Sequence, residues 1–215
     1  LTNASGVDGT VLMRSGASDF PAFVRNSSLG SMSTPAREGD TGVFSGTVSG
    51  ATIDHTTNFP VGHIIQIVNK NFTDSYSHSG IARTWVAVTG FTQTFTPTSS
   101  SNKVLVMLST TISNSNISEH TSVRVTRDGN SLSSQVGSRL AGLTGHQTPY
   151  SNTTNSTRNG TGWYYDSPNT TSQVTYAVWG FSGGDTFRMN AAHTNTDNNT
   201  YVMGISNLTL MEIVS

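Results

Sequence analysis

The chain has 215 residues, of which 33% are hydrophobic and 11% charged, with a formal net charge of −1 and no cysteine. The charged fraction is less than half of the about 25% usual in soluble domains, and Ser, Thr, Asn and Gly take the place of the missing charged and apolar residues. This composition argues against a nucleic-acid binder driven by bulk electrostatics, against disulfide cross-links and, since no apolar run is long enough, against insertion into a membrane.

Residues 1–58 are rich in glycine and show little sustained alternation of apolar and polar residues. They contain two short apolar patches, Thr10–Met13 and Ala22–Val24, and a strand-like stretch, Gly42–Val48. We therefore predict a first domain, 1–58, that is an extended Gly-rich arm or shaft segment and gains order by pairing with other chains. A flexible linker is the alternative interpretation.

Residues 59–215 form the second predicted domain, because apolar and polar residues alternate there with the period of two that is typical of β-strands. The first half predicts four strands: Val61–Val68, Thr84–Thr89, Thr92–Thr96 and Lys103–Ile112. Gly90 should separate the second strand from the third. Lys103–Ile112 (KVLVMLSTTI) is the most hydrophobic stretch and should be a central strand.

The middle of this domain contains a hairpin signal followed by a long polar stretch. Ser122–Thr126 precedes Asp128-Gly129, a dipeptide favoured in tight hairpin turns, and Ser131-Leu132 begins the return strand. Gln135–Asn159 is predicted to be a long surface loop with a short ordered piece near Ser138–Leu143.

The last third predicts four more strands: Thr161–Asp166, Gln173–Phe181, Thr186–Ala191 and Tyr201–Ile213. In the last one, Leu208, Leu210 and either Met211 or Ile213 should reach the core. No segment shows sustained helical periodicity. About eight to ten strands at this spacing predict an all-β fold, an antiparallel β-sandwich of the jelly-roll type.

Several strings of the second domain carry a resemblance to a known group of proteins. These strings are VGHIIQIV, WVAVTGFTQTFTPTSSSNKVLVMLST, SVRVTRDGNSL, YDSPNTTSQVTYAVWGF, GGDTFRMN and GISNLTLMEIVS. The series resembles a C-terminal module of bacteriophage virion proteins, especially those of marine and cyanobacterial phages, and its most specific part surrounds Pro97 and Lys103. Upstream, GVDGTVLMRSGASDFPAFV is similar to a junction of tail-fibre proteins, although Phe23 stands where such junctions often have Trp.

The resemblance implies a tumour-necrosis-factor-like jelly roll that assembles as a trimer on a fibre or a capsid. It implies a non-enzymatic structural component of the virion surface, a fibre tip or a surface decoration, that takes part in host attachment. The implied partners are two further copies of the chain, other virion proteins bound through the N-terminal arm, and a host surface glycan. The alternative function is a carbohydrate-binding module of a surface protein.

Three adjacent aromatic residues, Trp163, Tyr164 and Tyr165, are the candidate ligand-binding feature. Neighbouring residues of a strand point to opposite faces, so Trp163 and Tyr165 can share a surface while Tyr164 lies on the other. Aromatic rings stack on the apolar faces of sugars, which makes Trp163 and Tyr165 the predicted glycan-binding residues. Core packing is expected to occupy one of the two faces.

We predict no catalytic residue, metal or cofactor. The six histidines are dispersed and the carboxylates are scattered, and without helical periodicity no Ser is expected at the strand-to-helix turn of a nucleophile elbow. Two alternatives stay open: a metal bound on a threefold axis by one His from each chain, and a trimeric glycan hydrolase with carboxylates from different chains.

Two further expectations concern assembly and recognition. Ile64, Ile65, Val104 and Val106 should divide between the core and a subunit interface. The loops expected to contact a target are Gln135–Asn159, Gly183–Asp185 and Thr194–Thr200. Deletion of Thr144–Asn155 is expected to leave folding and trimerisation intact but to change what the particle adheres to.

Overall fold

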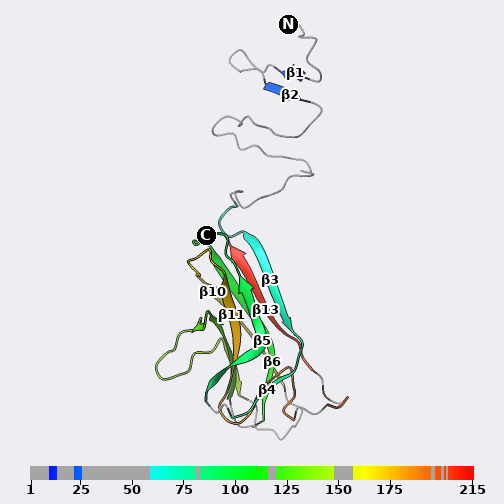
Figure 1. Cartoon of the computed structure of the whole chain (residues 1–215), viewed down its shortest axis with the longest axis vertical. Coiled ribbons are helices and arrows are strands. Elements are labelled where there is room, and N and C mark those ends of the chain that lie inside the picture. The colour runs from blue at the N-terminus through cyan, green and yellow to red at the C-terminus, as the bar shows by residue number, and fades with distance from the viewer. Residues whose placement is uncertain are drawn as a thin grey trace. The chain divides into compact units, whose positions relative to one another are not determined.

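A computed structural model of the chain describes residues 10–13, 22–25, 59–80, 83–115, 120–147, 157–194, 197–199, 201 and 203–215. The chain divides into two units, Leu1–Thr52 and Ile53–Ser215. In the first unit, β1 (Thr10–Met13) pairs antiparallel with β2 (Ala22–Arg25), as Figure 1 shows. The two predicted apolar patches thus pair with each other. The rest of the predicted arm, Gly42–Val48 included, lies outside the described residues.

Every regular element that the structure describes in the second unit is a β-strand, and the strands form two antiparallel sheets (Figure 1). The first sheet contains β3 (Ile64–Phe72), β13 (Ser206–Ile213), β6 (Lys103–Asn114), β12 (Phe187–Met189), β4 (Tyr76–His78) and β10 (Arg158–Asp166). The second sheet contains β5 (Trp85–Phe95), β11 (Val174–Ser182), β7 (His120–Arg127), β8 (Asn130–Ser131) and β9 (Thr144–Gln147).

The long strand β6 is the centre of the first sheet. β13 and then β12 pair along one of its edges, and β10 pairs along the other. The principal order is therefore β3-β13-β6-β10 in the first sheet and β5-β11-β7-β9 in the second. Numbered along the chain, these eight strands lie in the orders 1-8-3-6 and 2-7-4-5, the arrangement of a jelly roll made of two Greek keys.

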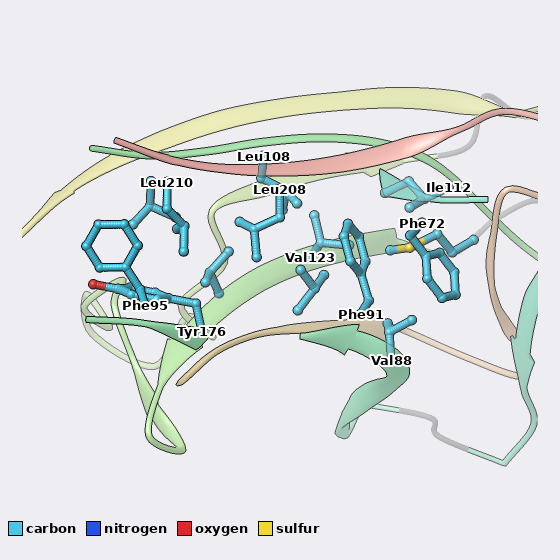
Figure 2. Close-up of a cluster of buried hydrophobic side chains, with 14 of the residues drawn as sticks. Phe72, Val88, Phe91, Phe95, Leu108, Ile112, Val123, Tyr176, Leu208 and Leu210 are labelled. Carbon is cyan, nitrogen blue, oxygen red and sulfur yellow. The ribbon is translucent and has the colours of Figure 1, made fainter. Parts of the chain in front are cut away.

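The core lies between the two sheets, because alternate residues of each strand face inward. Its fully buried residues include Val104, Val106, Leu108, Leu208 and Leu210 of the first sheet and Val88, Phe91, Phe95, Val123, Tyr176 and Val178 of the second. Figure 2 shows several of these side chains, such as Phe91, Phe95 and Leu208, between the ribbons of the two layers. Each large side chain buried in this way contributes about 1.5–3 kcal/mol of transfer free energy.

The predicted all-β antiparallel sandwich is confirmed, as is the central position of the Lys103–Ile112 strand. The predicted hairpin is also present: Asp128 and Gly129 connect β7 to β8 with φ of 50° and 83°. Positive φ at both central residues is what a type I′ turn requires.

Gly90 does not separate two strands, contrary to the prediction. β5 runs without interruption from Trp85 to Phe95. Its pairing with β11 shifts, since Ala87 lies opposite Trp179 and Thr92 opposite Ala177. Gly90, with φ of 81°, lies within this bulge, so the glycine bends the strand without ending it.

The prediction of a surface loop over Gln135–Asn159 is wrong in two places. Thr144–Gln147 forms β9, which pairs with β7, and β10 already begins at Arg158. Deletion of Thr144–Asn155 would remove an edge strand, so the structure no longer supports the expectation that this deletion leaves folding intact.

The prediction for the last strand is also wrong in one respect. Leu208 and Leu210 are fully buried, but neither Met211 nor Ile213 is; both lie on the outer face, and Glu212 points inward with no exposed surface. Of the residues expected to divide between core and interface, Val104 and Val106 are fully buried and Ile64 is half exposed. Ile65 is partly buried and lies at the irregularity in the pairing of β3 with β13.

Candidate functional site

The aromatic residues of β10 divide between the two sides of the first sheet, as predicted. Trp163 is 69% exposed and Tyr165 48% exposed, whereas Tyr164 packs against the core from within. Their separation follows from strand alternation alone. The structure thus brings Trp163 and Tyr165 to one outer surface, and their role in binding a ligand stays a prediction.

A row of apolar side chains crosses this outer surface. Tyr165 of β10 lies opposite Leu105 of β6, which lies opposite Met211 of β13. Met211 in turn lies opposite Ile67 of β3, which is 60% exposed. Cross-strand neighbours on one face lie within contact distance, so the row extends across four strands.

Apolar residues also lie on both sides of this row. Trp163 lies opposite the exposed Met107, and Ile213 lies opposite the half-exposed Ile64. We call the whole set the apolar stripe, and it consists of Ile64, Ile67, Leu105, Met107, Trp163, Tyr165, Met211 and Ile213. Half of the exposed large hydrophobic side chains among the described residues belong to it. Contiguous exposed apolar surface of this kind is typical of an interaction site.

Beyond the stripe, the same outer face becomes polar. Asn69 donates to Asn207 Oδ1 at 2.9 Å and to Thr209 Oγ1 at 2.8 Å, and Asn207 donates to Asn71 Oδ1 at 2.6 Å. A shallow depression of about 610 Å³ lies where the two regions meet, and its lining includes Met107, Ser109, Thr161, Trp163, Asn207 and Thr209. An indole ring beside hydroxyl and amide groups is an arrangement that can bind a neutral sugar.

The outer face of the second sheet carries a cluster that the sequence analysis did not identify as a site. Arg124 of β7 lies over two indole rings, 4.5 Å from the centroid of Trp85 and 5.2 Å from that of Trp179. The Trp85 and Phe181 rings lie 5.2 Å apart. Burial lowers the pKa of Arg124 below its usual value. The sequence indication of this cluster was Arg124 between two valines of a strand. The indication was not sufficient, because the aromatic partners of Arg124 come from β5 and β11.

Two of the carboxylates that the sequence scatters lie inside the sandwich. Asp166 accepts hydrogen bonds from Arg127 Nη1 at 2.7 and 2.6 Å and from the Tyr176 hydroxyl at 2.7 Å. Burial and the hydrogen bond to Asp166 raise the pKa of Tyr176. Burial alone would lower the pKa of Arg127, but its hydrogen bond to Asp166 and the carboxylate charge outweigh that effect and raise it.

Glu212, the other buried carboxylate, accepts hydrogen bonds from the backbone N and hydroxyl of Thr98 and from the Asn102 amide. The partners of Asp166 and Glu212 fix the ends of strands. Neither residue lines the depression beside Trp163 or the cleft beside Trp85. The arrangement on the two outer faces is therefore suited to contact and binding.

Comparison of the sequence with models of protein families and with curated proteins finds no match. Among the described residues, no three or more His, Asp or Glu side chains are grouped so as to hold a metal ion. The same residues include no helix with the length and apolarity needed to cross a membrane.

Proposed function

We propose that this chain is a non-enzymatic structural component of a bacteriophage virion, a homotrimeric fibre-tip or surface-decoration protein that takes part in attachment. The observation that carries the proposal is the apolar stripe. Only 33% of the residues are hydrophobic, yet eight apolar side chains are grouped on an outer surface where they add nothing to the core of a single copy.

The stripe has two different ends, which favours a ring of copies. Its β10 end carries the aromatic residues Trp163 and Tyr165, and its β3 end carries the aliphatic residues Ile64 and Ile67. Contact between the aromatic end of one copy and the aliphatic end of the next is heterologous. Such contacts form a ring where the rotation between copies closes, and an open filament where it does not. The resemblance to virion modules supplies the number three and the virion location.

Light scattering on the full chain in solution tests the assembly. We expect a mass about three times the 22.8 kDa of one chain. Ile67→Asp should dissociate the trimer, because it places a charge in the centre of the stripe. Val136→Asp is the matched control, since Val136 is a 70% exposed aliphatic residue outside the stripe.

A monomeric wild-type chain at micromolar concentration would contradict the trimer, and so would an Ile67→Asp variant that keeps the trimer mass. The virion location has its own test, which is mass spectrometry of purified particles of the source phage. Absence of the chain from those particles would refute that part of the proposal while leaving the assembly intact.

The alternative, a carbohydrate-binding module, is favoured by the depression beside Trp163. The two functions compete for the same surface, because a trimer contact would cover the indole ring. A neutral oligosaccharide that quenches the fluorescence of a monomeric wild-type chain, but not of Trp163→Ala, would support the alternative and contradict the trimer.

A further inference from the structure

We infer that the outer face of the second sheet carries a binding site for an acidic saccharide. The inference deepens the proposed attachment function and rests on it. A trimer formed through the apolar stripe uses the outer face of the first sheet, so the outer face of the second sheet, on the opposite side of the sandwich, stays accessible.

A cleft of about 670 Å³ marks the site, within the range of about 300–1,000 Å³ usual for small-ligand pockets. It is lined by Trp85, His120, Thr121, Ser122, Arg139, Leu140, Gly145 and Phe181. Trp85 and Phe181 are opposite one another in the β5–β11 pairing, and their rings are inclined by 43°. They form an aromatic side of the cleft that can stack on the apolar face of a pyranose ring.

The segment Arg139–Gly145 forms the other side of the cleft, and its backbone is held against β7. Leu143 N donates to Val123 O at 2.8 Å, and the Ser122 hydroxyl donates to Thr144 O at 2.6 Å. A Cβ on Gly142 would lie 2.3 Å from Ser122 Oγ, so only glycine permits this close approach. This side is therefore positioned before any ligand binds, which lowers the entropic cost of binding.

The described lining of the cleft carries one permanent charge, the guanidinium of Arg139, together with the imidazole of His120. None of the described lining residues is acidic. Asp185 lies in the turn that begins beside His120, where Gly183 N donates to His120 O. The carboxylate of Asp185 interacts electrostatically with Arg188. The cleft thus combines basic groups with an aromatic surface in a chain whose net charge is −1.

Arg124 strengthens the preference for an anion. Its guanidinium lies over Trp85 in contact with the aromatic side, and burial lowers its pKa, with no opposing contribution from a carboxylate of the described residues. Arg124 Nε and Trp85 Nε1 are buried and have no acceptor among the described residues. Both groups can only donate hydrogen bonds, and because they are buried they do not contact a ligand directly. The positive charge of Arg124 beside the aromatic side favours a carboxylate ligand over a cation.

A uronic-acid oligosaccharide has the required features, since it presents an apolar ring face and a carboxylate on every sugar. The test is a titration of the full chain with tetragalacturonate, followed by calorimetry and by tryptophan fluorescence, because Trp85 lies in the cleft. The carboxyl-reduced tetrasaccharide is the matched ligand. We expect it to bind at least tenfold more weakly, and the affinity of the acidic ligand to fall as salt is added.

Arg139→Gln is the decisive variant, because Arg139 is exposed at the cleft and its replacement should not affect folding. We expect it to reduce the affinity for tetragalacturonate about tenfold. Arg158→Gln, which removes an exposed arginine of β10 outside the cleft, should leave the affinity unchanged.

Three results would overturn the inference: no binding of tetragalacturonate, equal binding of the acidic and reduced ligands, or an Arg139→Gln variant that binds like wild type. Equal competition by sulfate or by a short single-stranded DNA would show a general anion site and would also overturn it. Light scattering on the same samples separates failure of this site from failure of the proposed trimer, because a trimer that binds no acidic saccharide retains its mass.

Discussion

The buried carboxylate of Glu212 provides a sharp test of how the end of the first sheet is held together. Glu212 Oε1 accepts three hydrogen bonds of 2.8 Å, from the backbone N and Oγ1 of Thr98 and from Asn102 Nδ2. With its amide oriented to donate, Gln66 supplies a fourth, to Glu212 Oε2 at 3.1 Å. One side chain of β13 thus joins the β5–β6 connection to β3, at the end of the sheet that carries Ile64 and Ile213.

Two substitutions separate the hydrogen bonds from the charge. Glu212→Ala removes the acceptor that the Thr98 and Asn102 donors share. Each buried donor left without an acceptor costs about 1–3 kcal/mol, so we expect a loss of about 4 kcal/mol for the set. Glu212→Gln keeps a carbonyl oxygen for the same donors, and Gln66 can turn its own amide to accept from the new NH₂ group. We expect Glu212→Gln to cost about 1 kcal/mol, the size of one ordinary hydrogen bond.

Urea unfolding at fixed protein concentration measures both effects. With a slope of about 2 kcal/mol per molar urea, a loss of about 4 kcal/mol lowers the midpoint by about 2 M for Glu212→Ala, and a loss of about 1 kcal/mol lowers it by about 0.5 M for Glu212→Gln. Equal midpoint shifts for the two variants would refute the reasoning, because they would show that the charge and not the set of donors stabilises this end of the sheet.

Two further predictions concern Tyr176 and Gly180. The folded-state pKa of Tyr176 is raised above its unfolded value of 10, so its contribution to stability is complete below pH 10 and is lost as pH rises above 10. Urea unfolding between pH 9 and 11 should therefore show that Tyr176 lowers the wild-type free energy of unfolding by up to about 1.4 kcal/mol per pH unit. A Tyr176→Phe variant whose free energy of unfolding falls equally steeply with pH would contradict this. Gly180→Ala should lower the free energy of unfolding by about 1–3 kcal/mol, because its Cβ would lie 2.4 Å from the buried Phe187 ring. Gly129→Ala is the control: its Cβ would meet open space, so only the positive φ should cost stability, by about 1 kcal/mol. Equal losses in the two variants would argue against crowding at Phe187.

Local patterns were sufficient to predict the features that depend on alternation within one strand. Lys103–Ile112 was predicted to be central because it is the most hydrophobic stretch of the domain, and β6 indeed has neighbours on both edges. The common face of Trp163 and Tyr165 also followed from the period of two. The same rule places Glu212 on the inner face with Leu208 and Leu210, but a preference for apolar residues at core positions led to the incorrect choice of Met211 or Ile213.

Features that depend on pairing between distant strands were not predictable from the sequence. The apolar stripe requires the order β3-β13-β6-β10, which joins residues from both ends of the domain. The contact of Arg124 with Trp85 and Trp179 requires β11 between β5 and β7. The continuity of β5 through Gly90 depends on the bulge opposite β11, and a glycine in isolation indicates a strand break as readily as a bulge.

The two outer faces of the sandwich differ in a way that suits them to different tasks. Contact through the apolar stripe removes large hydrophobic side chains from water, so it can give stable assembly with few copies. The cleft beside Trp85 offers one aromatic surface and the guanidinium groups of Arg139 and Arg124. A site of this kind gives modest affinity, since each net hydrogen bond contributes about 1 kcal/mol. Three clefts on one proposed trimer bind a polymeric saccharide at several points, and linked binding raises the apparent affinity by about 10²–10⁴ without any new contact. Assembly through one face thus makes weak recognition through the other face effective. A monomeric Ile67→Asp variant should therefore keep its affinity for a single tetragalacturonate molecule. The same variant should no longer be retained on a surface coated with the polymer.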